Sequence, residues 1–137
     1  MVLKVKPKSF GPIFVQFNGS DILQYFHGEV GEFSPAPPVN SPVDTMIAAL
    51  GSCIVKSIEW AADQRKVALL PFTVRLMGHK SPELPGRVEK VEIAVLGALV
   101  ADETLTLRIL KQAKSICTVS NTMNCDVSLT VEPGSEI

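Results

Sequence analysis

Residues 41–56 read SPVDTMIAALGSCIVK, and this stretch decides the fold of the chain. Ser41 is a favourable N-cap residue, Pro42 suits the first turn of a helix, and Asp44 follows three residues after the cap. Apolar residues then recur at helical spacing, at positions 46, 47, 50, 54, 58 and 61. We therefore expect one helix from Ser41 to about Lys66, ~25 residues and ~37 Å long.

This helix is apolar around most of its circumference, which is typical of a helix buried inside a protein. Small residues at positions 48, 49, 51 and 52 would let other elements approach its backbone closely. Cys53 lies near the middle of the helix. The sequence therefore predicts a long buried helix that carries a thiol at its centre.

The chain before the helix reads as a hairpin followed by a loop. Alternating apolar residues over 10–17 and again over 22–27 predict two strands, and the intervening NGSD at 18–21 is typical of a hairpin turn. Residues 28–40 are rich in Gly and Pro, which excludes a helix there.

The chain after the helix contains three further strands and a second helix. Residues 70–78 and 87–96 carry alternating apolar side chains and predict two strands. A helix over 102–117 and a final strand over 126–131 complete the chain. This order of elements predicts an α+β fold with a mainly antiparallel sheet.

Length and composition indicate one domain that spans residues 1–137. Hydrophobic residues make up 46% of the chain, which suggests that part of its apolar surface is buried between subunits. A net charge of −1 argues against nucleic acid as a partner. No apolar run reaches the ~18 residues of a membrane span, and the N-terminus has no signal-peptide pattern, so we expect a cytoplasmic protein with no membrane partner.

The chain has three cysteines, Cys53, Cys117 and Cys125. A disulfide framework is not expected in a reducing compartment, and the spacing of the cysteines matches neither a zinc site nor a thioredoxin motif. His27 and His79 lie far apart in the sequence, so we expect no metal site. The thiols are therefore either buried bystanders or redox-active groups.

Two segments together resemble the OsmC/Ohr family, the osmotically inducible protein C and organic hydroperoxide resistance proteins. Residues 41–53 combine Ser-Pro, Ala-Ala-Leu and Cys53 in the order of the first cysteine segment of that family. Residues 113–122, AKSICTVSNT, resemble the second segment, where a helix gives way to a strand at Cys-Pro-Val. The order of elements is also similar over nearly the whole chain. The resemblance implies an intertwined homodimer, in which antiparallel sheets pack around long buried central helices.

The resemblance also implies a thiol-dependent peroxidase that reduces organic hydroperoxides without a cofactor of its own. By position, Cys53 would be the peroxidatic thiol, which attacks the hydroperoxide and becomes a sulfenic acid. Cys117 would be the resolving thiol, which condenses with that sulfenic acid to a disulfide. An external dithiol, typically a lipoyl group, would then reduce the disulfide.

Some positions depart from the family pattern. Peroxidase members have a Glu where this chain has Val43, although Asp44 is next to it, and they use an Arg from the N-terminal strands, whereas the first Arg here is Arg65. Thiolate formation at Cys53 therefore needs another cation, because the field of the helix dipole fades within its first turn. Lys56 shares a helix face with Cys53, so Lys56 and Asp44 are possible supporting residues.

Two further interpretations remain open at the level of the sequence. The chain could be a binding module that holds a thiol-bearing or acyl ligand, such as lipoamide or coenzyme A, at the dimer interface without peroxide turnover. It could also be a structural dimer whose thiols only pack. Cys125 is either structural or an alternative disulfide partner for Cys117.

Overall fold

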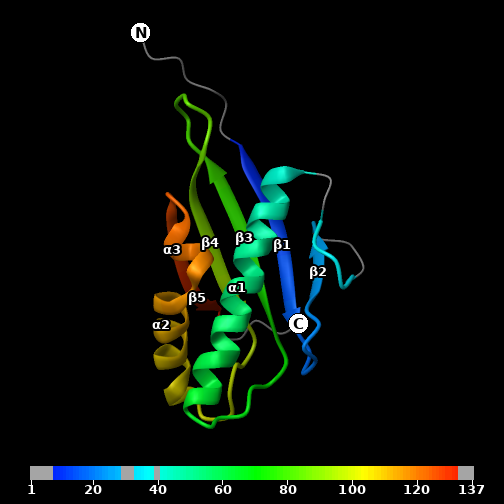
Figure 1. The fold of residues 1–137 in the computed structure, drawn as a ribbon, viewed down its shortest axis with the longest axis vertical. Helices are drawn as coiled ribbons and strands as arrows, with labels where there is room; N and C mark the ends of the chain where they lie inside the picture. Colours follow the sequence, from blue (N-terminus) through cyan, green and yellow to red (C-terminus); the bar gives the residue numbers. More distant parts are fainter. Residues whose placement is uncertain (1–7, 29–32, 39–40, 133–137) are drawn as a thin grey trace.

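The structure is a computed structural model that describes residues 8–28, 33–38 and 41–132. Its elements, in chain order, are β1 (Ser9–Phe17), β2 (Gln24–His27), α1 (Pro42–Gln64), β3 (Phe72–Lys80), β4 (Val88–Leu96), a 3₁₀ turn (Glu103–Leu105), α2 (Thr106–Ile116), α3 (Thr118–Thr122) and β5 (Asp126–Glu132) (Figure 1).

The five strands form one sheet in the order β2-β1-β3-β4-β5. The pairings of β1 with β2, of β1 with β3 and of β3 with β4 are antiparallel. In contrast, β5 runs parallel to β4, and Ile93 lies opposite Leu129. The sheet is therefore mixed. The parallel pair arises because α2 and α3 carry the chain back along the sheet before β5 begins.

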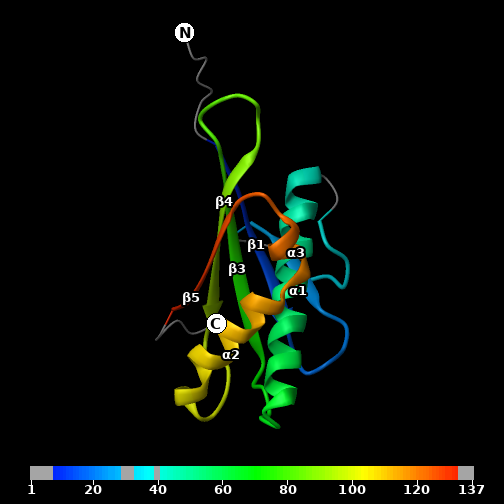
Figure 2. The ribbon, with the colours of Figure 1, turned by 60° about the vertical axis from the view of Figure 1, so that its left-hand side comes forward.

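The three helices lie on one face of the sheet (Figure 2). α1 packs across β1 and β3, and Gly51 is a point of close approach, where a Cβ atom would lie only 2.7 Å from side-chain carbons of Val15 and Leu76. The side chains of Ile54 and Ile93 are fully buried in the same layer. The prediction that small residues on α1 allow close packing is thus confirmed at Gly51.

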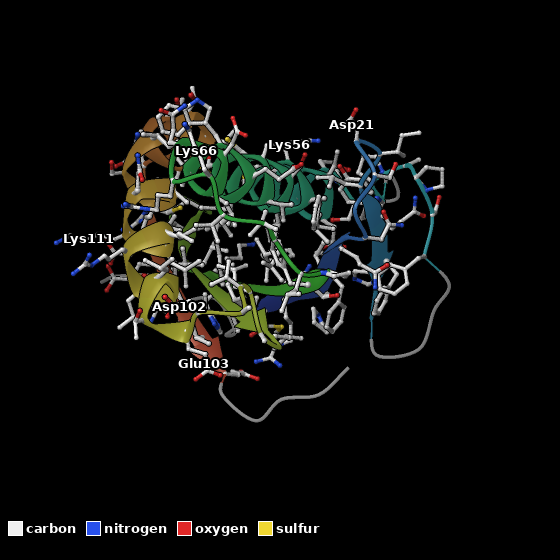
Figure 3. All side chains as sticks on the ribbon, turned by 90° about the horizontal axis from the view of Figure 1, so that it is seen from below. Asp21, Lys56, Lys66, Asp102, Glu103 and Lys111 are labelled. Atoms are coloured by element: carbon white, nitrogen blue, oxygen red, sulfur yellow. The ribbon has the colours of Figure 1, made fainter. Side chains whose placement is uncertain are left out.

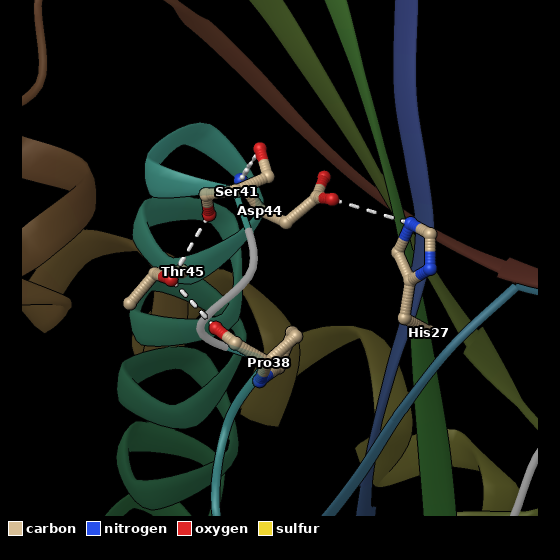
Figure 4. Close-up of polar contacts among 5 residues, drawn as sticks. All are labelled: His27, Pro38, Ser41, Asp44 and Thr45. Atoms are coloured by element: carbon tan, nitrogen blue, oxygen red, sulfur yellow. Dashed lines mark hydrogen bonds and ion pairs between the residues drawn. The ribbon is translucent and has the colours of Figure 1, made fainter.

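The start of α1 confirms the predicted cap. The Ser41 Oγ accepts a hydrogen bond from the backbone N–H of Asp44 at 3.3 Å. The Thr45 hydroxyl lies 2.6 Å from the carbonyl oxygen of Pro38 and 3.0 Å from that of Ser41 (Figure 4). These contacts fix the point at which the chain enters α1. The helix ends at Gln64, two residues before the predicted end at Lys66.

Some predicted boundaries were wrong for local reasons. β2 begins at Gln24, later than predicted, because the Ser20 hydroxyl accepts from the N–H of Ile22 and prolongs the turn. The second helix is interrupted, because the Asp102 carboxylate accepts from the N–H of Thr104 and starts a 3₁₀ turn before α2. α3 was not predicted at all.

The loop before α1 was predicted over residues 28–40. Residues 29–32 and 39–40 lie outside the described residues. Within the described part of the loop, Ser34 pairs with Tyr25 on the outer edge of β2 through two backbone hydrogen bonds of 2.7 and 2.9 Å.

One face of α1 is not covered by the described residues of the chain. Met46 and Trp60 on this face are 38% and 47% exposed, and Cys53 between them is half-buried. By length and hydropathy α1 is the one described helix that could cross a membrane, but its other faces pack against the sheet as the core helix of this domain.

Candidate thiol site

The fold brings Cys53 and Cys117 together. Cys53 lies in the middle of α1, whereas Cys117 lies between α2 and α3, where it ends the first helix and begins the second. α2 packs on the α1 layer through Ile109 and Ala113, which are fully buried. The Cys53 side chain lies close enough to the Cys117 thiol to raise its pKa, and both cysteines are free.

The two thiols differ in exposure. Cys117 is fully buried, and this burial raises the pKa of its thiol to about 11. The backbone N–H of Ser120 lowers the pKa of the Cys117 thiol, the neighbouring Cys53 raises it, and the backbone N–H of Val119 lowers it. At neutral pH Cys117 is therefore a protonated thiol, which can donate its S–H to Cys53. The half-buried Cys53 is the sulfur that solvent reaches.

Lys56 does not direct its ammonium toward a thiol. Its Nζ lies 3.0 Å from the carbonyl oxygen of Asp21 and 3.3 Å from a carboxylate oxygen of Glu59. Figure 3 shows Lys56 beside Asp21, on the turn between β1 and β2. In the described chain Lys56 therefore ties the hairpin to α1.

Asp44 lies in the first turn of α1 and contacts the N-terminal hairpin. Its Oδ2 is 3.2 Å from the Nε2 of His27, at the end of β2 (Figure 4). The other oxygen, Oδ1, is buried and has no hydrogen-bond partner among the described residues. Nine residues of helix, a rise of ~13 Å, separate Asp44 from Cys53. Within one chain, the Asp44 carboxylate and the Cys53 thiol are therefore not parts of the same site.

Sequence reasoning missed the contact between His27 and Asp44. It treated His27 only as one of two distant histidines. The available signal was the position of His27 at the end of the return strand, from which a single loop leads to the cap of α1. At the end of this strand the chain has a histidine, and its ring lies 3.2 Å from the Asp44 carboxylate.

Cys125 has surroundings of its own at the start of β5. It lines an open depression of about 470 Å³ together with Arg87, Met123 and others. Burial, and after it the neighbouring Asp126 carboxylate, raise the pKa of the Cys125 thiol. Within the described part of the chain, no group of three or more His, Cys, Asp or Glu side chains is placed to hold a metal ion.

A family model described as OsmC-like protein matches residues 37–132, which includes all the residues of this site except His27. No curated protein matches the chain at a significant level.

Solved structures show a similar fold at low sequence identity. An OsmC-like protein from Mycoplasma pneumoniae superposes with a TM-score of 0.60 at 11% identity, over 94% of this chain and 96% of that one. An OsmC-like hydroperoxide resistance protein from Jannaschia sp. gives 0.57 at 17% identity, over 85% of both chains. An organic hydroperoxide resistance protein OsmC from Legionella pneumophila gives 0.54 at 14% identity, over 93% of this chain and 97% of that one.

Proposed function

We propose, because this chain belongs to the OsmC-like protein family, that it reduces organic hydroperoxides through Cys53 and Cys117. The observation that carries this proposal is the proximity of the two cysteines, which are free and come from different parts of the helical layer: the Cys53 side chain lies close enough to raise the pKa of the Cys117 thiol. The likeness to solved hydroperoxide resistance proteins adds support for a role with peroxides.

The exposure of the two thiols supports the roles proposed for them. The Cys53 thiolate attacks the terminal oxygen of the hydroperoxide, the O–O bond breaks, and the alkoxide leaves as an alcohol after taking a proton. Cys53 is then a sulfenic acid. The sulfur of Cys117 attacks the sulfur of Cys53, and water leaves as the disulfide forms. A dithiol supplied from outside, of the lipoyl type, returns both thiols.

The proposal includes a homodimer, because the described chain leaves Cys53 without a cation. The face of α1 that carries Met46, Cys53 and Trp60 is apolar and uncovered, as expected of a subunit interface. A partner chain on this face would cover Met46 and Trp60 and bring its own polar groups near the Cys53 thiol. A reducing cytoplasm suits a thiol pair that must be reset after each turnover.

Peroxide consumption with dihydrolipoamide as reductant tests this function. We expect the wild type to consume cumene hydroperoxide, Cys53→Ser to lose this activity, and Cys117→Ser to lose turnover while it still forms a sulfenic acid. Cys125→Ser is the matched control and keeps the activity. Without reductant, substoichiometric peroxide should link Cys53 to Cys117, as mass spectrometry can show. Retention of both thiols after peroxide treatment would refute the proposal.

A ligand-binding module is the second candidate function. Neither Val43 nor the N-terminal hairpin matches the acid and the Arg of the peroxidases, and an open depression of about 400 Å³ beside Trp60 and Leu69 offers space along α1. For this function we expect native mass spectrometry to detect co-purified lipoamide or coenzyme A, in a protein that leaves cumene hydroperoxide unchanged.

A further inference from the structure

The outer face of α2 carries three cations. Arg108, Lys111 and Lys114 are spaced by three residues and are all exposed, whereas Ile109 and Ala113 on the opposite side are buried. Figure 3 shows Lys111 projecting outward from α2. The helix contains no Asp or Glu, so no anion of its own lies between these charges. We call Leu107, Arg108, Lys111 and Lys114 the basic face.

The three cations are not balanced by the rest of the domain. None of the ion pairs formed within the described residues includes Arg108, Lys111 or Lys114. Like charges at three-residue spacing repel one another and weaken a helix. The chain as a whole has a net charge of −1, so the basic face is a local concentration of charge. An anionic partner is the group that would balance it.

An exposed leucine points to a protein as this partner. Leu107 is 73% exposed and lies within one helical turn of both Arg108 and Lys111. An apolar residue ringed by charged residues is the usual arrangement of a protein–protein interface. Nucleic acid binding commonly needs a larger basic footprint and gains little from an exposed leucine.

The basic face is also close to the thiols. α2 ends at Ile116, and Cys117, the partner of Cys53, is the next residue. Lys114 lies only three residues, ~4.5 Å of helix rise, before Cys117. A protein that docks on this face therefore lies beside the end of α2 that leads into Cys117, the neighbour of Cys53.

We propose that the basic face of α2 is the docking surface for an acidic protein that carries the reducing dithiol. This inference rests on the proposed function. One thiolate of the docked protein attacks the Cys53 sulfur of the disulfide, and the bonding electrons leave with Cys117, which takes a proton. The second thiolate attacks the mixed disulfide and releases Cys53. The carrier leaves as an intramolecular disulfide.

Reduction of the oxidised protein by two reductants tests this docking surface. One reductant is an acidic dihydrolipoyl domain, and the other is dihydrolipoamide, which is small and carries no net charge. For Arg108→Glu/Lys111→Glu/Lys114→Glu, we expect the rate with the domain to fall about tenfold or more at low ionic strength. The rate with dihydrolipoamide should stay within about twofold, because the thiols are unchanged. Salt should slow the wild type with the domain but not the triple variant.

A matched pair of single variants controls for the change of charge. Lys111→Glu should slow reduction by the domain, whereas Arg87→Glu should not, because Arg87 is an exposed cation in the turn between β3 and β4, beside Cys125 and not on α2. A triple variant that the domain reduces at the wild-type rate overturns the docking surface and leaves the proposed function intact.

Failure of the proposed function has a different signature. In that case no Cys53–Cys117 disulfide forms, or dihydrolipoamide does not reduce it. Calorimetric titration with the oxidised lipoyl domain then tests whether the domain binds to the basic face, since binding needs no redox step. Binding at low salt that the triple variant loses supports the surface. Equal binding by both proteins, or no binding by the wild type, overturns it, as does tighter binding of duplex DNA than of the domain.

Discussion

Cys117 differs from the other two cysteines in that it is fully buried and has a second thiol, that of Cys53, close enough to raise its pKa. Burial keeps it protonated, and the adjacent N–H groups of Val119 and Ser120 lie where a thiolate would gain from them. A thiol in this state is a poor first nucleophile. Its role begins once Cys53 has been oxidised to a sulfenic acid, because the Cys117 sulfur then attacks a neighbouring sulfur.

The raised pKa of Cys117 predicts a pH dependence of stability. The folded protein holds this proton up to about pH 11, whereas the ordinary value for the thiol is 9.0. As the pH rises between these values, the unfolded chain loses the proton first, so the free energy of unfolding decreases. One proton limits the slope to about 1.4 kcal/mol per pH unit.

Urea unfolding of the reduced protein between pH 8 and pH 11 would measure this effect. Cys117→Ser is the control, and we expect its unfolding free energy to depend less steeply on pH than that of the wild type over this interval. Equal slopes in the two proteins would show that Cys117 ionises alike in the folded and unfolded chains, and would contradict the buried, protonated thiol.

The sequence predicted individual residues well where the cause is local. The Ser41 cap depends on the next three residues, and the position of Cys53 on a helix depends on the apolar pattern around it. The partners of Asp44 and Lys56 could not be read in the same way, because both lie on the N-terminal hairpin, which reaches α1 only through tertiary packing. Lys56, for example, lies three positions after Cys53 but directs its ammonium to Asp21 on the hairpin.

At the scale of elements, the close approach of α1 to the sheet uses positions without a side chain, and Gly51 on α1 is one of them. Gly51 lies against Val15 and Leu76, and a Cβ atom there already comes within 2.7 Å of both. We expect Gly51→Leu to lower the free energy of unfolding by about 2 kcal/mol, because overpacking of about 3 kcal/mol outweighs the gain of about 1 kcal/mol in helix propensity.

The control for this prediction is Gln64→Leu, which adds the same side chain at an exposed position in the last turn of α1. Its unfolding free energy should stay within about 0.5 kcal/mol of the wild type. Chemical denaturation of both variants measures the difference. If Gly51→Leu were as stable as Gln64→Leu, α1 could not be packed on β1 and β3 as described.

The elements that sequence analysis missed depend on contacts outside their own residues. α3 has the sequence TVSNT, rich in residues of low helix propensity, and it is held by the Asn121 side chain on the carbonyl of Ser115. The alternation that predicts β5 is the same for a parallel and an antiparallel strand. Its direction follows from the path of α2 and α3, which the alternation does not encode.

At the scale of the whole molecule, the chain exposes large apolar side chains at more than one place, and the proposed dimer would bury only some of them. Met46 and Trp60 flank Cys53 on the uncovered face of α1, while Leu84, which is 55% exposed, lies in the turn between β3 and β4. The resemblance to an intertwined dimer predicts burial for the α1 face. It gives no such role to Leu84, which therefore serves as the matched control.

We expect Trp60→Asp to weaken the dimer by about 30-fold or more, because a charge would replace a large apolar side chain at the interface. Leu84→Asp should leave the dimer unchanged. Sedimentation velocity over a range of concentrations measures both. Trp60 is the only tryptophan of the chain and is 47% exposed in one subunit, so its emission should also shift to shorter wavelength as the wild type associates. A wild type that stays monomeric at every concentration, with the emission of a solvated tryptophan, would leave Cys53 facing solvent and rule out a partner chain as the source of its missing cation.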